Sequence, residues 1–382
     1  MRWLFWASVG LIGYAYAGYP CWLWLRAQLR PQPVKRSAVT PRISFVMVVR
    51  NEETVLREKL KNLLELDYPE ESSQLVVVSD GSSDGTEAIL SVAAANPRVH
   101  AVLNQLSGGK AAGLNDGLQW ADGEIVVFTD ARQKIERGAI RLLMENFADP
   151  QVGAVSGELM LGDAASGESG RKMGLYWKIE KLVRKLESAG GSVVGATGAI
   201  YAVRRELVAE IPPDTILDDV LIPMNVAKQG FRVTFDERAR AWDHADLGTE
   251  REFRRKVRTL TGNYQLLQLA PWLLSGESPL RFEFFSHKLM RLAVPFFLVL
   301  LAVASWMTPG EFYRAAFWAQ IGLYGLSLLG SAGWNLGPVS RVCDAAYTFV
   351  ALNAAAVVAF ANFATGNMRV WSQPALRKEV KA

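Results

Sequence analysis

Cysteine is almost absent from this chain of 382 residues, which contains only Cys21 and Cys343. Each lies in or beside a long apolar run, so neither a disulfide framework nor a cysteine-based metal site is expected. A strong charge of one sign is also missing. The net charge of +4 is small and spread along the chain, which argues against nucleic acid as a partner. The sequence contains no internal repeat and no low-complexity tract.

Uncharged apolar runs occupy both ends of the sequence, whereas the middle has the composition of a soluble domain. Residues 3–25 carry no charge and are long enough to cross a hydrocarbon layer of about 30 Å as a helix. Three more uncharged runs follow, at residues 292–310, 315–340 and 345–368. We therefore predict a transmembrane helix within residues 1–26 and several within residues 291–368, all in contact with membrane lipids.

The N-terminal run has a competing interpretation as a cleaved signal peptide, because Ala15-Tyr16-Ala17 resembles a small-residue cleavage site. An apolar run that continues to Leu25 favours an uncleaved span. Four basic residues follow this run: Arg26, Arg30, Lys35 and Arg36. By the positive-inside rule they place the next domain in the cytoplasm, as in a multi-pass protein of the bacterial inner membrane.

The C-terminal end conflicts with this topology. Three spans that start in the cytoplasm would place the polar tail, residues 369–382, outside. The tail nevertheless carries four basic residues, which favour the cytoplasm. A re-entrant run among the three would remove the conflict.

Short β-branched runs alternate with helical segments from Ile43 onwards, which predicts an α/β domain at residues 42–247. Continuous apolar runs predict four buried parallel strands, at residues 43–49, 75–79, 99–103 and 125–129. A helix is expected from Asn51, as its cap, until Pro69. Further on, the pattern predicts a strand at 194–203, a helix at 218–229 and a strand at 231–235. Residues 249–274, within an interfacial region at 248–290, predict an amphipathic helix on the bilayer surface.

Asp80 stands at the end of the second strand, before a turn rich in glycine and serine and a helix start. Ligands of open parallel sheets bind at this edge, where a carboxylate can accept hydrogen bonds from a base or a ribose. A well-capped turn between strand and helix would use the same residues. Asp130 repeats the arrangement at the end of the fourth strand. Neighbouring acids need positive charge between them, and Lys110 and Arg132 are the candidates, unless they are ordinary surface charges.

Together these motifs resemble the membrane-integrated, inverting glycosyltransferases of family 2, such as the hyaluronan, cellulose and poly-N-acetylglucosamine synthases. The matching elements, in order, are Asn51-Glu52-Glu53, the Asp80 to Thr86 motif, Gly109-Lys110-Ala111, Leu114-Asn115 and the second acidic motif. The resemblance covers most of the chain and implies a GT-A-type α/β domain that binds a nucleotide sugar. It implies that Asp80 contacts the base of a UDP-sugar with help from Lys110.

The second acidic motif departs from the family pattern, because Asp130-Ala131-Arg132 has arginine where the family has a second aspartate. In the family this motif holds a divalent cation on the donor diphosphate. Asp130 and water could still bind Mg²⁺ or Mn²⁺, or Arg132 could neutralise part of the diphosphate charge in place of the cation. We expect a metal at Asp130.

Asp219 occupies the family position of the catalytic base, in Leu217-Asp218-Asp219-Val220. Inversion by a single displacement needs a carboxylate that takes the proton of the attacking hydroxyl. The competing interpretation is a capping pair, since aspartate is favourable at a helix start whatever the function. By resemblance, Asp218 belongs with Thr197 and Gly198 on the acceptor side.

Arg258 matches the family arginine that contacts the diphosphate, in the stretch from Arg255 to Thr259. Thr259 replaces the tryptophan that supports the acceptor sugar in the synthases, so a processive polymerase is not implied. The same basic residues could instead bind lipid head groups. The sequence therefore predicts a transferase acting on a saccharide or lipid-linked acceptor. A polyprenyl-phosphate glycosyltransferase and a catalytically silent membrane subunit remain alternatives, and a transporter is disfavoured because the terminal runs carry almost no charge.

Overall fold

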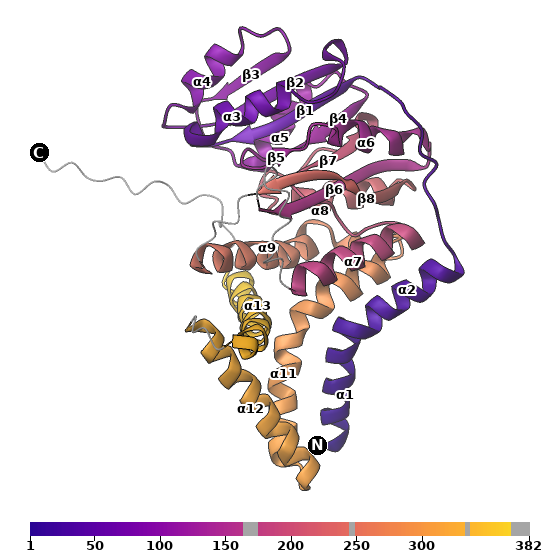
Figure 1. Ribbon diagram of the computed structural model, residues 1–382, viewed down its shortest axis with the longest axis vertical. Coiled ribbons are helices and arrows are strands. Elements are labelled where there is room, and N and C mark those ends of the chain that lie inside the picture. Colours follow the sequence, from indigo (N-terminus) through magenta and orange to yellow (C-terminus); the bar gives the residue numbers. More distant parts are fainter. Residues whose placement is uncertain (163–174, 244–248, 333–336, 368–382) are drawn as a thin grey trace, which may run out of the picture.

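The computed structural model describes residues 1–162, 175–243, 249–332 and 337–367. An α/β domain lies above a layer formed by the helices α7 (Leu175–Gly190) and α9 (Thr249–Leu269), and long helices extend below that layer (Figure 1). The tail predicted at residues 369–382 lies outside the described residues.

One mixed sheet of eight strands forms the upper domain, in the order β3-β2-β1-β4-β7-β6-β8-β5. The strands are β1 (Ile43–Val49), β2 (Ser73–Asp80), β3 (Val99–Asn104), β4 (Ile125–Phe128), β5 (Lys134–Ile135), β6 (Val152–Leu161), β7 (Tyr201–Arg204) and β8 (Arg232–Asp243). The first four are parallel, as predicted, whereas β7 runs antiparallel to both β4 and β6. The parallel sheet predicted from the first four strands therefore continues beyond β4 as a mixed sheet, in which β6 and β8 are again parallel to each other.

Both faces of the sheet are buried, which explains why the strands are continuously apolar. Phe45 and Met47 point into one core with the helices α3 (Glu53–Leu64), α4 (Thr86–Ala93) and α6 (Ala139–Glu145). Val46 points into the other core with α5 (Lys110–Trp120) and α8 (Asp218–Lys228). The alternation follows the two-residue period of a strand, so the carboxyl ends of β1, β2 and β4 are held between two packed layers.

Two local predictions need correction. Asn51 does not cap α3: it has a positive φ of 54°, and its side-chain oxygen accepts a hydrogen bond from the backbone N–H of Ser83. The helix ends at Leu64, well before Pro69. The strand predicted at residues 194–203 begins only at Tyr201, because Gly195 has a φ of 96° and the backbone turns there toward α8.

The lower part consists of long helices. The N-terminal stretch is continuous through α1 (Arg2–Gly13), a π-helical turn η1 (Tyr14–Gly18) and α2 (Tyr19–Leu29). It is followed in the C-terminal part by α11 (Met290–Met307), α12 (Glu311–Ser331) and α13 (Ser340–Ala364). By length and composition, two helical stretches among the described residues are able to cross a membrane, Arg281–Met307 and Ser340–Ala364.

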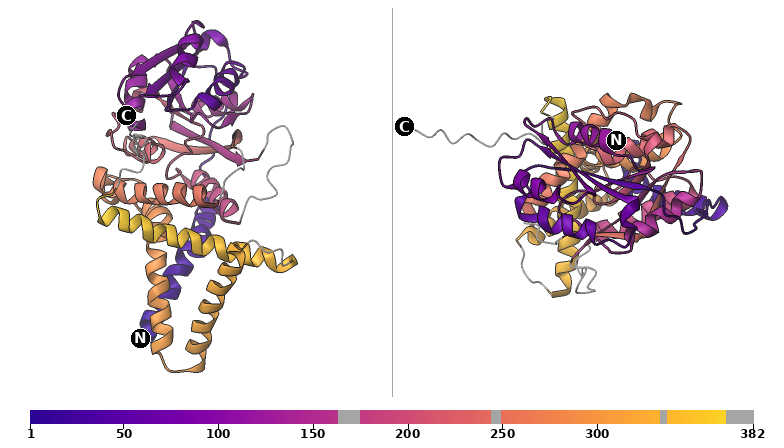
Figure 2. Two further views of the ribbon diagram at one scale, coloured as in Figure 1. Left: turned by 90° about the vertical axis from the view of Figure 1, so that its left-hand side faces the viewer. Right: turned by 90° about the horizontal axis from the view of Figure 1, so that it is seen from above.

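Helix α13 lies along α9 (Thr249–Leu269) and crosses the direction of α11 and α12, as the left view of Figure 2 shows. Tyr264 of α9 stacks on Phe363 of α13, with ring centroids 5.3 Å apart. Helix α9 ends five residues earlier than predicted, since Pro271 begins a short 3-10 helix, η5 (Pro271–Leu274). Helix α13 therefore packs beneath α9, on the side of the α7–α9 layer that faces away from the sheet domain.

Candidate active site

Three carboxylates meet around one lysine at the carboxyl edge of the sheet. Asp130 follows β4, while Asp218 and Asp219 are the first residues of α8. The Nζ atom of Lys110 lies 2.9 Å from Asp130 Oδ1 and 3.1 Å from Asp218 Oδ2. Burial lowers the pKa of Lys110, but the three carboxylates outweigh it and hold that pKa above its usual value. The lysine therefore stays charged and balances part of the negative charge.

Asp80 fixes the loop that delivers Lys110. Its buried carboxylate accepts hydrogen bonds from Ser107 Oγ at 2.7 Å and from the backbone N–H groups of Gly108 and Gly109 at 2.7 and 3.1 Å. Gly109 has a φ of 91°, which favours glycine, and it directly precedes Lys110 at the start of α5. The structure thus places Asp80 in the support of this loop and not beside Asp130.

The two adjacent aspartates of α8 have different surroundings. Asp218 is buried, with 3% of its surface exposed, and is paired with Lys110. Asp219 is half-buried, and its Oδ2 accepts a hydrogen bond from the backbone N–H of Gly198 at 3.2 Å. Desolvation and the negative charge of Asp218 raise the pKa of Asp219 to about 6. Asp219 is therefore the carboxylate that can meet a ligand and take up a proton near neutral pH.

Gly198 brings the acceptor-side loop against these acids. A β-carbon at this position would lie 3.0 Å from Asp130 Oδ2 and 3.6 Å from Asp219 Oδ2. The loop is also held by a hydrogen bond of 2.7 Å from the N–H of Ala196 to the carbonyl of Asp219. Thr197 lies between these two contacts and is buried. Residues 196–198 and the start of α8 consequently form one unit.

Helix α9 holds the segment that precedes the catalytic-base candidate. Gln265 accepts a hydrogen bond from the N–H of Ile216 at 2.9 Å and donates one to the carbonyl of Asp214 at 2.7 Å. Gly262 allows the close approach, since a β-carbon there would lie 2.5 Å from the Leu217 side chain. Arg258 lies one turn before Gly262, so it belongs to the same face of α9.

The predicted donor-site residue Arg132 lies away from the lysine-centred cluster. Its guanidinium pairs with Glu52 at 3.1 Å, and half of its side chain is exposed. Glu52 is in turn anchored by its backbone N–H, which donates to Thr86 Oγ1 at 3.0 Å. Arg132 therefore links the loop after β4 to the loops after β1 and β2.

Sequence reasoning missed Lys59 and Tyr201. Lys59 is buried in α3 and donates hydrogen bonds to Thr129 Oγ1 at 2.8 Å and to the carbonyl of Gln133 at 2.7 Å, on both sides of Asp130. Burial lowers the pKa of Lys59 to about 7. The available signal was a lysine on the apolar face of a helix, between Leu56 and Leu60.

Tyr201, the first residue of β7, is also buried beside the acids and stacks on Phe128 of β4 with ring centroids 4.8 Å apart. Burial and the charges of Asp218 and Asp219 raise the pKa of its phenol well above the usual value. The hydroxyl therefore stays protonated beside the carboxylates. No feature of the sequence distinguished this tyrosine from an ordinary strand residue.

The site offers a divalent cation few side-chain ligands. Among the described residues, no group of three or more His, Cys, Asp or Glu side chains is arranged to hold a metal ion. Asp130 is the open member of the cluster, with 42% of its side chain exposed. Because Mg²⁺ is often held by one or two carboxylates together with substrate phosphates, Asp130 fits as a protein ligand of such an ion.

Comparison with known proteins agrees with this architecture. Residues 44–211 match the family model described as glycosyl transferase family 2. The poly-beta-1,6-N-acetyl-D-glucosamine synthase of Staphylococcus aureus (strain COL) is 24% identical over 229 residues, which are 59% of this chain and 55% of the synthase. The corresponding synthase of Staphylococcus epidermidis is 24% identical over 234 residues, 60% of this chain and 56% of the synthase. The chain thus spans about half the length of these curated relatives.

A solved structure has a similar fold over nearly the whole chain. It is the mannosyltransferase PcManGT from Pyrobaculum calidifontis, in complex with GDP-Man and Mn²⁺. The match has a TM-score of 0.72 and 23% identity, and it covers 94% of this chain and 99% of that one. At this identity the likeness shows the fold, which is GT-A-like. With a family match that begins in β1 and ends before α8, this chain carries a glycosyltransferase family 2 domain.

Proposed function

We propose that this protein transfers a sugar, with inversion, from a nucleotide-diphosphate sugar to an acceptor hydroxyl held at a membrane. The observation that supports this most is the environment of Asp219, which is half-buried, held by Gly198 and has a pKa raised to about 6. A general base works best when its pKa lies near the operating pH. Its neighbour Asp218 is buried and paired with Lys110, so it is not available for this role.

In the proposed reaction, Asp219 takes the proton of the acceptor hydroxyl as that oxygen attacks the anomeric carbon of the donor. The bond between the anomeric carbon and the diphosphate oxygen breaks on the opposite side, and the nucleotide diphosphate leaves with additional negative charge. Lys110 lies among the carboxylates, where its ammonium can stabilise that charge. Lys59 and Tyr201 keep the surrounding loops in place.

A divalent cation bound with the donor would neutralise part of the diphosphate charge. We propose Asp130 as its protein ligand and Arg132 as a partial substitute once donor binding releases it from Glu52. Asp80 would act on the nucleotide by holding the loop at Ser107 to Gly109, or directly on the base if that loop moves. Arg258, on the face of α9 that approaches the segment before α8, is proposed for the diphosphate.

We also propose a membrane topology in which α1–α2, α11 and α12 cross and α13 lies on the surface with α9. This proposal is supported by Figure 2, where α9 and α13 lie along each other and across the direction of α11 and α12. Phe360 of α13 also contacts Tyr264 of α9 and Phe296 of α11. An even number of crossings after the cytosolic domain returns the chain to the cytoplasm, in agreement with the basic tail. The catalytic domain is then cytosolic, where nucleotide sugars are available.

The donor and acceptor classes are tested with purified full-length protein in native lipid, using radiolabelled UDP-sugars and GDP-mannose. Both nucleotides are included because the relatives make an N-acetylglucosamine polymer by name and PcManGT binds GDP-Man. We expect hydrolysis or transfer from at least one donor, with label appearing in a lipid or saccharide fraction. Label on polyprenyl phosphate would identify the lipid-linked alternative. Absence of turnover with every donor would contradict the proposal and favour a catalytically silent subunit. That alternative rests on Arg132 and Thr259, which replace the aspartate and the tryptophan of the family pattern.

A further inference from the structure

Helix α3 holds the segment that follows β4. The Nζ atom of Lys59, which is 3% exposed, donates hydrogen bonds to Thr129 Oγ1 at 2.8 Å and to the carbonyl of Gln133 at 2.7 Å. One turn later, Asn62 accepts a hydrogen bond from the N–H of Ile135 at 2.8 Å and donates one to its carbonyl at 2.9 Å. These contacts fasten both ends of the segment to α3.

A buried lysine on the apolar face of a helix is costly unless its amine has partners. Lys59 makes no ion pair within the described residues, and burial lowers its pKa to about 7. An apolar side chain between Leu56 and Leu60 would be buried at lower cost. An amine can donate two hydrogen bonds whether or not it is protonated, and this one makes two. Hydrogen-bond donation, and not a charge pair, therefore accounts for this lysine.

Thr129 carries the connection on to the acceptor-side loop, which extends to Ala199. The hydroxyl of Thr129 accepts the hydrogen bond from Lys59 and donates one to the carbonyl of Ala199 at 2.8 Å. Ala199 follows Gly198, whose N–H donates to Asp219 Oδ2. A chain of hydrogen bonds thus runs from α3 through the end of β4 to the loop that contacts the proposed base, and each bond in such a chain strengthens the next.

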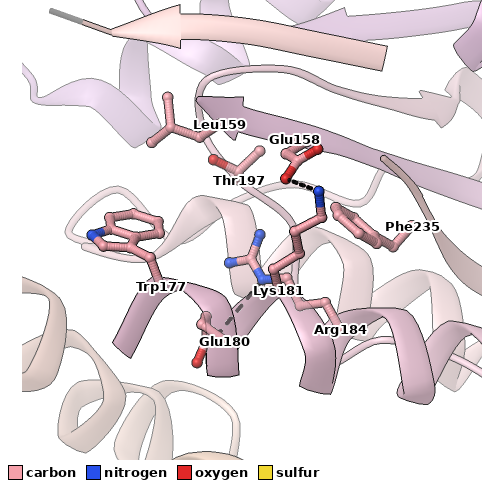
Figure 3. A pocket seen from close by; sticks show the side chains of 8 residues that line it. All are labelled: Glu158, Leu159, Trp177, Glu180, Lys181, Arg184, Thr197 and Phe235. Carbon is pink, nitrogen blue, oxygen red and sulfur yellow. Dashed lines mark ion pairs between the residues drawn. The ribbon is translucent and has the colours of Figure 1, made fainter. Parts of the chain in front are cut away.

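The other side of the acceptor-side loop meets a pocket. Figure 3 shows Thr197 facing this small cavity, which lies between β6, α7 and β8 and has a volume of about 70 Å³. Such a volume admits a few water molecules, so packing on this side contributes little to fixing the loop. The N–H of Thr197 donates to Ser156 Oγ at 3.2 Å, and the hydroxyl of Thr129 holds the carbonyl of Ala199. The position of the loop therefore depends on a few hydrogen bonds.

Building on the proposed function, we infer that Lys59 and Thr129 are positioning residues, which set the acceptor-side loop against Asp130 and thereby favour transfer to the acceptor over hydrolysis of the donor. Both act through the loop and not on the reacting atoms. An acceptor hydroxyl must lie within about 3.5 Å of the anomeric carbon, and a displacement of about 1 Å can lower the rate about 10²-fold. A water molecule is small and is not oriented by the acceptor-side loop. Loss of the chain should therefore lower transfer more than hydrolysis.

The first test measures transfer and hydrolysis separately, with purified full-length protein in native lipid. The probe is the radiolabelled UDP-sugar or GDP-mannose that the protein uses. Label in the lipid or saccharide fraction reports transfer, and free labelled sugar reports hydrolysis. We expect Thr129→Val to lower kcat for transfer at least about tenfold and hydrolysis less than about threefold, with nucleotide affinity within about twofold of wild type. Thr129→Ser should restore most of the transfer, because it keeps the hydroxyl.

Lys59→Met removes the donor of the same chain, so it should act in the same direction. Because the two residues act as a unit, Lys59→Met should add little to Thr129→Val in the double variant. Lys61→Met is the matched control, since Lys61 is exposed on the same helix, two residues further on. It should leave both activities at the wild-type level.

The second test needs no turnover, so it separates failure of this inference from failure of the proposed function. Hydrogen exchange followed by mass spectrometry reports the opening of backbone N–H groups in the full-length protein without ligand. Peptides that cover residues 196–203 should exchange at least about fivefold faster in Thr129→Val than in wild type, because the carbonyl of Ala199 loses its donor. Lys59→Met should have the same effect, since Thr129 then loses its own donor. Exchange in β2 should be unchanged, which controls for global destabilisation.

Two results would overturn the inference. One is a Thr129→Val enzyme in which transfer and hydrolysis fall by the same factor. The other is exchange of residues 196–203 at the wild-type rate in Thr129→Val, even if Lys59→Met accelerates it. A wild type that uses no donor, with exchange that responds as expected, would instead contradict only the proposed function, and the positioning of the loop by Lys59 and Thr129 would stand.

Discussion

Replacing Asp219 by asparagine separates a general base from a helix cap. Asparagine can still accept the hydrogen bond from Gly198, but it cannot accept a proton. The structure already speaks against a capping role, because the N-cap of α8 is Leu217 and no side chain makes a capping hydrogen bond there. A general base contributes roughly 10² to 10⁴-fold to turnover, so we expect kcat to fall within or above that range. Donor affinity should remain near that of the wild type, because the change removes an interaction of the transition state.

The raised pKa of Asp219 predicts that the same substitution, which lowers activity, increases the stability of the fold. Its pKa increases from 3.8 to about 6 on folding, so the folded state binds the proton more tightly than the unfolded state. The free energy of unfolding therefore decreases as the pH rises through this window, by up to about 3 kcal/mol at neutral pH. Asp219→Asn removes this ionisation, so the variant should be more stable than the wild type at pH 7, with the difference shrinking toward pH 4.

Both effects are measurable on the same preparation. Donor turnover in the wild type should rise with pH through about 6, and thermal unfolding should be followed for both proteins from pH 4 to pH 8. Asp218→Asn is the matched comparison, since Asp218 pairs with Lys110 and should affect stability and lysine placement more than proton transfer. An active Asp219→Asn enzyme, or one that is inactive only because it is unfolded at pH 7, would refute the reasoning.

Three other predictions follow from the site and the helix layer. Asp80→Ala leaves three donors of the Ser107 to Gly109 loop without their acceptor, so it should lower the free energy of unfolding by about 2 kcal/mol and weaken nucleotide binding at least tenfold. A chelator should weaken nucleotide binding to the wild type only in part. Unchanged binding to Asp80→Ala in isothermal titration calorimetry would exclude Asp80 from donor binding. Gly198→Ala places a methyl group 3.0 Å from a carboxylate oxygen and should lower kcat more than tenfold at unchanged fold by circular dichroism, whereas a fully active variant would show that the loop adapts. In a cysteine-free background, cysteines introduced at Ser72 and Thr365 should react with an impermeant maleimide only after the membrane is permeabilised, whereas a cysteine at Pro309 should react in intact cells. Labelling of the cysteine at position 365 in intact cells would show that α13 crosses the membrane.

The parallel half of the sheet was predictable because its strands are buried on both faces, which leaves continuous apolar runs in the sequence. The mixed half was not, since β7, the strand that reverses direction, is only four residues long and the glycine-rich stretch before it resembles a strand by composition. Asp80 and Asp130 at the sheet edge predicted a basic residue between them. In the structure Lys110 pairs with Asp130, but its second partner is Asp218, while the carboxylate of Asp80 binds the loop at Ser107 to Gly109. The difference between Asp218 and Asp219 could not be read from sequence, because it depends on which carboxylate faces Lys110 and which faces Gly198.

Contacts between segments far apart in the chain also could not be predicted from the sequence. The clamp of Gln265 on residues 214–216 joins segments about 50 positions apart, and nothing in either segment marks the pairing. The direction of α13 is another case, because an apolar helix of 25 residues has the composition of a membrane span whether or not it lies across the others.

The stereochemistry of transfer tests the central claim most directly. Purified full-length protein in native lipid is given the donor that it uses, labelled with ¹³C at the anomeric carbon, and the configuration of the first product is read by NMR before any mutarotation. A base at Asp219 acting by single displacement predicts a product of inverted configuration, β from an α-linked donor, which Asp219→Asn forms at least about a hundredfold more slowly than the wild type. Retention of configuration, or equal product from both proteins, would contradict the account.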